Sequence, residues 1–592
     1  MKKLLIYLKD YKKETVFAPL FKMLEAGFEL FVPLVMAAII DNGIANADMP
    51  YVLKMGLVLV ALGIIGLICS ITAQFFAAKA AVGFSTQLKH ALFEHIQSLS
   101  FTEMDEIGTS TMITRMTSDT NQVQNGVNMV LRLFLRSPFI VFGAMIMAFT
   151  IDVKAALIFV VTIPVLSIVV FGIMMITMPL YKKVQAGLDK ILGKTRENLT
   201  GVRVIRAFHK EEQEIEEFEE DNRTLTHMQL FVGKIAALTN PVTYIIVNVA
   251  TIALIYTGAV RVDNGAITQG EVVALVNYMS QILVELVKLA NLIITITKAL
   301  ACANRIESVF AMQSGMEWAA DGRLVTAEDK RTKGIEAEDI AKEHAKDENT
   351  GIYAVEFNHV SLTYKGAGDE SLTDIDFKVK KGETIGIIGG TGSGKSSLVH
   401  LIPRFYDATK GSVKINGRDV KEYGMEELRE KIGIVLQKAV LFQGTIRENL
   451  KWGNDSATEE EMNRALEISQ AKEFVDSKPG GLDAQISQGG KNLSGGQRQR
   501  LTIARAVVRQ PEILILDDSA SALDYATDAK LRKAIREMEK DTTVFIVSQR
   551  TSSIQHADQI IVLEDGCVVG MGTHENLLER CEVYKEIHYS QS

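Results

Sequence analysis

Long apolar stretches fill the first half of the chain and give way to short alternating segments in the second half. Six stretches are long enough to cross a bilayer as helices, at about 16–40, 52–76, 129–151, 155–178, 236–260 and 272–297. The segments at 77–128 and 180–234 are polar and favour helix, with few turn signals. Because neither has an apolar core of its own, the pattern predicts membrane helices that continue into the cytoplasm and turn there.

Cations near the ends of these stretches predict the orientation of the chain. Lysines crowd residues 2–13, and eight Lys and Arg side chains lie between 182 and 210. The opposite loops at 41–50, 152–154 and 261–270 are short and nearly free of cations. Since Lys and Arg resist translocation, we expect a multi-pass protein of the cell membrane with both ends in the cytoplasm. Residues 1–10, apolar among lysines, predict a short helix on the inner membrane surface.

The pattern after the sixth stretch predicts a change of domain. Residues 314–352 are rich in Asp, Glu, Lys, Ala and Gly, which is typical of a charged linker. We therefore expect a transmembrane domain at 1–313 and a soluble domain at 353–592. Alternation at 355–357 and 375–379 predicts antiparallel strands at the start of the soluble domain. The expected fold class is an all-α six-helix membrane domain followed by an α/β nucleotide-binding domain.

Composition adds constraints on partners and cofactors. A length of 592 residues is too great for a single core. The formal net charge of −8, without a basic face or reading motif, argues against a nucleic-acid partner. The four cysteines lack metal-ligand spacing, so neither a zinc site nor a disulfide is expected.

A glycine-rich turn in the second half predicts nucleotide binding. Residues 384–388 form a buried-strand pattern, and Lys395 to Phe405 predicts the helix that follows the turn. The turn and the first helical residues are Gly389, Gly390, Thr391, Gly392, Ser393, Gly394, Lys395, Ser396 and Ser397. Backbone N–H groups of such a turn hold phosphates, Lys395 adds a positive charge, and Ser396 offers an oxygen to Mg²⁺. The sequence therefore predicts that the chain binds ATP or GTP.

Further motifs follow in a fixed order along the chain. They are Tyr364 before the turn, Gln437 after it, the signature Leu493-Ser494-Gly495-Gly496-Gln497, the acidic strand 513–517, and Ser521-Ala522-Leu523-Asp524. With these motifs the chain resembles the ATP-binding cassette (ABC) exporters in which six membrane helices precede one nucleotide-binding domain. The resemblance covers nearly the whole chain, including residues 101–119 and 201–208. It implies an ATP-hydrolysing transporter that uses ATP and Mg²⁺.

The resemblance implies roles for the matching residues. Tyr364 would stack on adenine, with a plain strand aromatic as the alternative. Asp517 would hold Mg²⁺ through water, and Gln437 would touch Mg²⁺ and the attacking water. The signature would grip the γ-phosphate of ATP held by the other subunit. The nucleotide-binding residues implied in this way include Ser494, Gly495, Gly496, Gln497 and Asp524.

Two positions of the hydrolytic apparatus depart from the family. Asp518 stands where the family has a glutamate that polarises the attacking water, and Gln549 stands where it has a histidine. Aspartate withdraws the carboxylate by roughly 1 to 1.5 Å, a displacement able to cost about a hundredfold in rate. Glutamine still donates a hydrogen bond, but it cannot become a cation or relay a proton. Gln488 is a smaller departure, because the family usually has a glutamate there.

These departures predict a dimer with two unequal ATP sites. Both fall on the hydrolytic step, whereas Lys395, Ser396, Gln437, Asp517 and the signature are spared. The pattern resembles one member of the heterodimeric exporters, whose second half-transporter carries the glutamate and the histidine. Neutral drift in a homodimer that hydrolyses slowly is the alternative. We expect hydrolysis mainly at the partner's site.

Cargo is less strongly indicated by the sequence. Glu25, Glu29, Glu285 and Lys288 are costly in lipid and should face a cavity or a partner. Lys22 with Glu25, and Glu285 with Lys288, would alternatively neutralise each other. The methionines at 145, 147, 174, 175 and 178 suit either an adaptable binding surface or plain packing. The expected cargo is a hydrophobic, amphipathic or cationic compound, as in multidrug exporters; alternatives are a lipid or peptide exporter and a regulatory ATP-binding membrane subunit.

Overall fold

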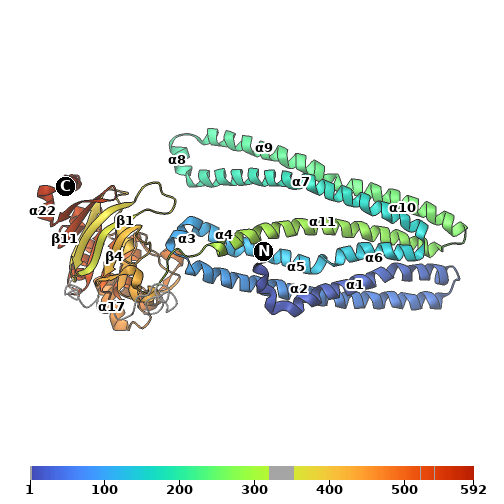
Figure 1. The fold of residues 1–592 in the computed structure, drawn as a ribbon, viewed down its shortest axis with the longest axis horizontal. Helices are drawn as coiled ribbons and strands as arrows, with labels where there is room; N and C mark the ends of the chain where they lie inside the picture. Colours follow the sequence, from blue (N-terminus) through green and yellow to red (C-terminus); the bar gives the residue numbers. More distant parts are fainter. Residues whose placement is uncertain (1–2, 319–352, 520–521, 539–540, 592) are drawn as a thin grey trace, which may run out of the picture. The chain divides into compact units, whose positions relative to one another are not determined.

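The protein divides into two compact units in the computed structural model, which describes residues 3–318, 353–519, 522–538 and 541–591 (Figure 1). The first unit contains Met1–Gln97 and Gly108–Met312, and the second contains Ser98–Ile107 and Gln313–Ser592. Most of the predicted linker, residues 319–352, lies outside the described residues. The short segment Ser98–Ile107 belongs to the second unit, although apolar helices flank it in sequence.

Six helical runs in the described part of the first unit are long and apolar enough to cross a membrane. They are Leu4–Ile44, Met49–Ser98, Thr109–Ile151, Val153–Thr200, Glu211–Asp263 and Gln269–Ala311. Each predicted span lies inside one of these runs, in the same order. The prediction of six apolar helices is therefore confirmed, and the helices extend well beyond the apolar stretches.

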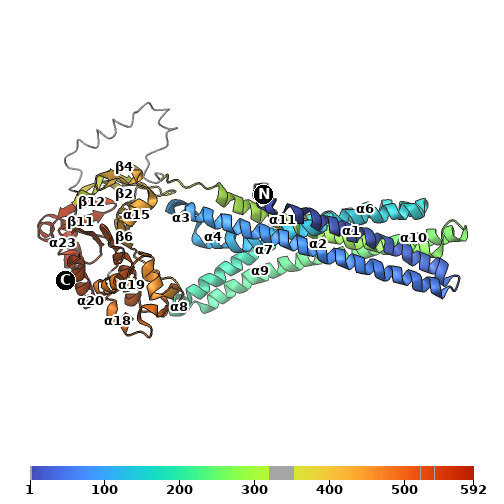
Figure 2. The same cartoon turned by 90° about the horizontal axis from the view of Figure 1, so that it is seen from below.

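The runs are built from α-helices with local irregularities. The α-helices are α1 (Lys12–Ala38), α2 (Met49–Ser98), α4 (Thr109–Thr114), α5 (Thr120–Leu133), α6 (Arg136–Ile151), α7 (Val153–Thr200), α8 (Val202–Ala207), α9 (Glu211–Ala237), α10 (Thr239–Asp263) and α11 (Gln269–Ala311). A 3-10 helix at Leu4–Tyr11 precedes α1, and π-helical turns occupy Ile39–Ile44 and Arg115–Asp119. Helix α7 packs along α9 and α10, and α8 joins α7 to α9 at one end of the pair (Figures 1 and 2).

Small residues and specific caps explain how these helices start and pack. Fully buried alanines on α1, α6, α7 and α11 let the backbones approach closely. Helix α11 begins at a capping box formed by Thr268 and Glu271. Asp152 caps α7 by accepting from Ala155 N at 2.8 Å, and it also accepts from Arg261 Nε at 3.0 Å. The loop-facing ends of α7 and α10 are thereby tied together.

The second unit is an α/β domain built on three sheets. The four-stranded sheet has the order β2-β1-β4-β5, the six-stranded sheet β12-β11-β3-β10-β9-β6, and the small sheet β7-β8. The strands are β1 (Tyr353–Leu362), β2 (Leu372–Lys380), β3 (Thr384–Gly389), β4 (Lys410–Ile415), β5 (Arg418–Asp419), β6 (Ile432–Val435), β7 (Gly444–Thr445), β8 (Gln485–Ile486), β9 (Ile513–Asp517), β10 (Thr543–Val547), β11 (Gln559–Glu564) and β12 (Cys567–Gly572). The predicted antiparallel pair is confirmed, because β1 pairs with β2 with Phe357 opposite Phe377.

Helices cover the parallel strands of the larger sheet. The described helices of this unit are α3 (Phe101–Ile107), α14 (Lys395–Leu401), α15 (Met425–Glu430), α16 (Ile446–Lys451), α17 (Glu459–Ile468), α18 (Lys472–Asp476), α19 (Gly495–Val507), α20 (Tyr525–Arg536), α21 (Thr551–Ile554), α22 (His574–Arg580) and α23 (Glu582–Tyr589). On β9, Ile513 and Ile515 enter one apolar cluster, while Leu514 and Leu516 enter another. Burial on both faces explains why this strand is a continuous apolar run.

Helix α14 is shorter than the sequence predicts. It ends at Leu401, whereas the prediction continued it to Phe405. Pro403 explains the difference, because proline lacks the N–H group that would continue the helical hydrogen bonds to Val399 O. The chain then turns at Arg404, whose φ is +52°.

The turn after α14 meets helix α3 within the second unit. The rings of Phe101 and Phe405 lie 4.5 Å apart between centroids, and the Tyr406 hydroxyl donates to Asp105 Oδ2 at 2.6 Å. Lys365 pairs with Glu106 at 2.8 Å. Helix α3 therefore packs directly against the segment that follows the phosphate-binding turn.

Candidate nucleotide-binding site

The carboxyl ends of three neighbouring parallel strands form the candidate site. Strand β3 leads into the glycine-rich turn, β9 into Asp517 and Asp518, and β10 into Ser548 and Gln549. This edge of an open α/β sheet is the usual position for ligands. A cavity of about 740 Å³ lies there. The predicted residues that line it are Thr391, Gly392, Ser393, Gly394, Lys395, Ser396, Ser397, Gln437, Asp517, Asp518 and Gln549.

The glycine-rich turn has the geometry that its residues predict. Gly392 and Gly394 have φ of +85° and +93°, which side chains rarely adopt. Lys395 Nζ donates to the carbonyl oxygens of Gly389 at 2.9 Å and Gly390 at 2.6 Å. Burial lowers the pKa of the Lys395 ammonium. The cation is thus held at the floor of the turn, where phosphate oxygens are expected.

Oxygen donors suited to Mg²⁺ meet beside the turn. Ser396 Oγ donates to Asp517 Oδ1 at 3.0 Å, and the Gln437 amide lines the same cavity. Burial raises the pKa of the Asp517 carboxyl, because it penalises the charged form. Hydroxyl, carboxylate and amide oxygens are the donors that Mg²⁺ prefers. The residues present therefore fit a magnesium ion that is bound together with nucleotide phosphates.

Asp518 is hydrogen-bonded through both its backbone and its side chain. Its N–H donates to Val547 O at 3.1 Å, and its φ is +44°. The carboxylate accepts from Gln437 Nε2 at 3.3 Å. Because the Cα position is fixed, the reach of the carboxylate into the cavity is set by the length of the side chain.

Gln549 lies in the loop after β10 with an exposed side chain. The preceding residue continues the sheet, since Ser548 N donates to Ile387 O at 3.0 Å, and Ser548 Oγ accepts from Arg550 N at 2.9 Å. His556 is exposed in the turn that follows α21 and does not line the cavity. The structure thus brings Gln549, and not His556, to the nucleotide site.

Several predicted residues lie outside the cavity lining. Tyr364 donates its hydroxyl to Ser397 Oγ at 2.9 Å, and its ring meets Tyr406 edge-on at 5.0 Å. Gly389 is packed so tightly that a Cβ would lie 2.1 Å from Leu563 O. Asp524 caps α20 by accepting from Thr527 N at 2.9 Å. Adenine stacking by Tyr364 stays a prediction.

The signature lies at the start of helix α19, whose N-cap residue is Ser494. Ser494 and Gln497 form a capping box, with Gln497 N donating to Ser494 Oγ at 3.2 Å and Ser494 N donating to Gln497 Oε1 at 3.1 Å. Ser494 and Gly495 are exposed. None of the four residues Ser494 to Gln497 lines the cavity of this chain.

Sequence reasoning missed several residues at this site. His400 Nε2 lies 3.7 Å from Asp517 Oδ2, and burial lowers the pKa of the imidazole. It follows Ser396 by four residues on α14, and that spacing is the signal that would have found it. Asp565 and Gly566 line the cavity itself, whereas His400 lies behind Asp517 and does not. Gly566 has φ of +80° in the turn between β11 and β12, and no motif in the sequence pointed to its place at the nucleotide cavity.

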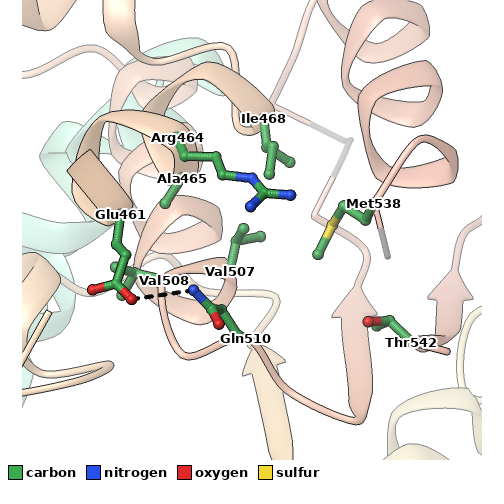
Figure 3. A pocket seen from close by; sticks show the side chains of 9 residues that line it. All are labelled: Glu461, Arg464, Ala465, Ile468, Val507, Val508, Gln510, Met538 and Thr542. Atoms are coloured by element: carbon green, nitrogen blue, oxygen red, sulfur yellow. Dashed lines mark hydrogen bonds between the residues drawn. The ribbon is translucent and has the colours of Figure 1, made fainter. Parts of the chain in front are cut away.

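A second pocket in the same unit is far too small for a nucleotide. It measures about 40 Å³ and lies among Glu461, Arg464, Ala465, Ile468, Val507, Val508, Gln510, Met538 and Thr542 (Figure 3). Gln510 Nε2 donates across it to Glu461 Oε1 at 3.4 Å. The pocket holds a few waters at most.

The predicted membrane charges gather around one residue that sequence reasoning missed, Arg136 of α6. Its Nη1 donates to Glu285 Oε1 at 2.6 Å and its Nη2 to Glu29 Oε2 at 2.7 Å. Glu285 also accepts from Lys288 at 2.8 Å. The predicted neutralisation of Glu285 by Lys288 is therefore present, and so is that of Glu25 by Lys22, at 2.5 Å. A cation inside a predicted span was the available signal.

Two cavities adjoin this charged cluster and share Glu29 and Val32. One, of about 370 Å³, is lined by residues of α1, α6 and α11, including Glu285 and Lys288. The other, of about 560 Å³, is lined by Glu25, Arg136 and residues of α1 and α2. The Glu29 side chain is 43% exposed, whereas that of Glu285 is 4% exposed. Glu29 is thus the accessible carboxylate of the cluster.

A nucleotide-binding domain of this design on one chain with six membrane helices defines an ATP-driven membrane transporter. The model of the ABC transporter transmembrane region matches residues 15–286, and that of the ABC transporter family matches residues 372–521. An uncharacterized ABC transporter ATP-binding protein of Mycobacterium bovis is 36% identical over 591 residues, covering 99% of this chain and 97% of the relative. The chain belongs to the ABC transporter family, and it is a multi-pass exporter with an ATP-hydrolysing domain.

Other relatives differ in what their names say they move. A Bacillus subtilis protein named "Putative multidrug export ATP-binding/permease protein" is 31% identical, covering 100% of this chain and 99% of the relative. An ATP-dependent lipid A-core flippase of Vibrio vulnificus is 26% identical, covering 100% and 97%. The structure of a bacterial Atm1-family ABC exporter with ATP bound superposes with a TM-score of 0.78 at 22% identity, covering 98% of this chain and 99% of that one. This last likeness confirms the exporter fold.

Proposed function

We propose that this chain is one subunit of a heterodimeric ABC exporter and that it binds ATP at a hydrolytically impaired site. One observation carries the proposal: Asp518 and Gln549 line the same cavity as an intact set of phosphate- and magnesium-binding residues. The groups that hold nucleotide are present, whereas the two that would activate water and relay a proton are changed. A site of this kind retains ATP.

The residues of the cavity divide the work. Lys395 and the backbone N–H groups of the turn bind phosphate oxygens. Ser396 and Asp517 hold Mg²⁺, which when bound neutralises phosphate charge. Asp518 must polarise the attacking water from a backbone that its N–H bond to Val547 fixes. A carboxylate that falls short by about 1.5 Å is a poor general base.

The signature of this chain would serve the other subunit. Ser494 and Gly495 are exposed and lie outside this chain's own cavity, as a surface that completes a partner's site must. The partner half-transporter would carry the glutamate and histidine that are lacking here. ATP binding closes such a pair of domains, and hydrolysis at the partner's site resets it.

Nucleotide retention tests this proposal. The full-length chain would be purified alone and with its partner half-transporter in nanodiscs, and hydrolysis and release of radiolabelled ATP measured. We expect very slow hydrolysis by the chain alone, and turnover with the partner that depends on the partner's glutamate. Lys395→Ala serves as the control without phosphate binding. Brisk hydrolysis by the self-paired chain would instead support a homodimeric ATPase.

The cargo we propose is hydrophobic or amphipathic, as in multidrug export. The named function of the Bacillus subtilis relative supports this class, and so do the two cavities around Glu29, which combine apolar walls with charge. Export from the inner leaflet or the cytoplasm suits a chain whose two ends are predicted to face the cytoplasm. The Vibrio vulnificus relative makes lipid the second candidate.

Inside-out vesicles holding the complete exporter distinguish these functions. We expect ATP-driven uptake of a cationic dye that falls several-fold in Glu29→Gln, since the accessible carboxylate of the cluster is lost. Glu216→Gln, an exposed site on α9, is the matched control. Transfer of a fluorescent phospholipid with no dye uptake would favour a lipid exporter. Partner ATPase activity without either movement would favour a regulatory subunit.

A further inference from the structure

The last two helices bring the carboxyl end of the chain to the loop that carries Gln549. Tyr584 of α23 is fully buried in an apolar cluster with Ile388 of β3 and Ile554 of α21. Its hydroxyl lies 2.7 Å from His574 Nδ1 on α22. Helix α23 is therefore fixed to the strand that enters the phosphate-binding turn and to the helix that follows the Gln549 loop.

Gln591 extends this anchor onto the loop itself. A helical turn continues past α23, because Ser590 N donates to Glu586 O at 3.0 Å and Gln591 N to His588 O at 3.2 Å. The Gln591 amide then forms hydrogen bonds with the residues before and after Arg550. Its Nε2 donates to Gln549 O at 2.6 Å, and its Oε1 accepts from Thr551 N at 2.9 Å.

These bonds complete a two-sided attachment of Gln549. On the other side, Ser548 N donates to Ile387 O at 3.0 Å, so the loop is tied to β3 before Gln549 and to the chain end after it. The Gln549 side chain stays exposed and lines the nucleotide cavity. Backbone bonds thus fix where this side chain starts, while the side chain itself is free to reach a ligand.

We propose that Gln591 is a positioning residue for Gln549, through which the carboxyl end of the chain sets the preference of this site for ATP over ADP. The inference rests on the proposed location of Gln549 beside the γ-phosphate. A carboxamide suits this task because one group supplies both the donor for a carbonyl and the acceptor for an N–H. Loss of the anchor lets the loop move, and the γ-phosphate loses a correctly placed donor.

Nucleotide affinity measured with both MgATP and MgADP tests the inference. The full-length chain in nanodiscs would be titrated as wild type, Gln591→Ala and Gln591→Glu. We expect the ratio of ATP to ADP affinity to fall about three- to tenfold in Gln591→Ala. A loss of this size corresponds to part of the free energy of one hydrogen bond to a charged group. Gln591→Glu keeps the acceptor for Thr551 N and loses the donor to Gln549 O, so its ratio should fall as well. ADP affinity should not change.

A double-mutant cycle separates positioning from a structural role. In a Gln549→Ala background, Gln591→Ala should leave the ATP to ADP ratio unchanged. The matched control is Gln555→Ala, whose amide contacts His556 at 3.3 Å. Equal losses for ATP and ADP, or an undiminished effect without the Gln549 side chain, would overturn the inference. If the wild type binds neither nucleotide, the proposed ATP site fails instead.

Discussion

Replacing Asp518 by glutamate lengthens the side chain by one methylene and advances its carboxylate by about 1.5 Å. The Asp518 N–H bond to Val547 O restrains the main chain, so the added methylene is the main source of this distance. A displacement of this size is worth about a hundredfold in rate, or about 2.7 kcal/mol of activation free energy. We therefore expect Asp518→Glu to raise ATP hydrolysis by this chain about a hundredfold.

The same change has a predictable cost in stability. Asp518 has φ of +44°, in the left-handed region that aspartate tolerates better than glutamate. We expect the substitution to cost about 1 kcal/mol and to lower the Tm of the nucleotide-binding domain by about 2–4 °C. A gain in rate together with a loss in stability would indicate that the left-handed backbone conformation at this position favours aspartate over glutamate.

Single-turnover hydrolysis of radiolabelled ATP by the full-length chain, purified alone in nanodiscs, measures the rate. Asp518→Asn is the control for charge, and it should hydrolyse no faster than the wild type. Asp518→Glu with Gln549→His should exceed Asp518→Glu alone, because a histidine can relay a proton. An Asp518→Glu rate within twofold of the wild type, at unchanged ATP affinity, would refute the argument from side-chain length.

Three further predictions concern stability. Arg136→Ala removes the guanidinium from the Glu285 carboxylate, which is 4% exposed and keeps its Lys288 contact, and should cost about 2 kcal/mol, seen as a lower unfolding midpoint in detergent; Arg136→Lys should cost less. Tyr406→Phe removes the bond to Asp105 and should cost about 1 kcal/mol without changing ATP affinity, which calorimetry and nucleotide titration would show. Burial raises the pKa of Asp528, so its proton is held more tightly in the folded state, and stability falls as pH rises from the unfolded pKa through the folded one. Asp528→Asn should remove that fall from Tm profiles recorded upward from about pH 4, and an unchanged profile would contradict it.

Features set by local chemistry were predictable from the sequence. The phosphate-binding turn, the acidic strand at β9 and the signature at the start of α19 each depend on residues within one short segment. The six apolar helices follow from length and composition alone. Pro403 shows the limit of periodicity, because the apolar pattern continues past a residue that has no N–H group for the next helical hydrogen bond.

Features that join distant segments were not predictable. Arg136 meets Glu29 and Glu285 across 107 and 149 residues of sequence, and no local pattern pairs them. Gln591 lies 42 residues from Gln549, beyond the last recognisable motif. The seven-residue helix α3 likewise falls between long helices and gives no sign that it packs against Phe405.

The position of α3 determines where the ATP-binding unit can be cut from the rest. A fragment that starts at Tyr353 would leave the aromatic rings of Phe405 and Tyr406 without their cover from Phe101 and Asp105. Uncovered rings next to one another invite self-association in water. Supplying a peptide that spans Ser98–Ile107 should restore solubility to such a fragment, since ten residues encoded among the membrane helices complete its surface.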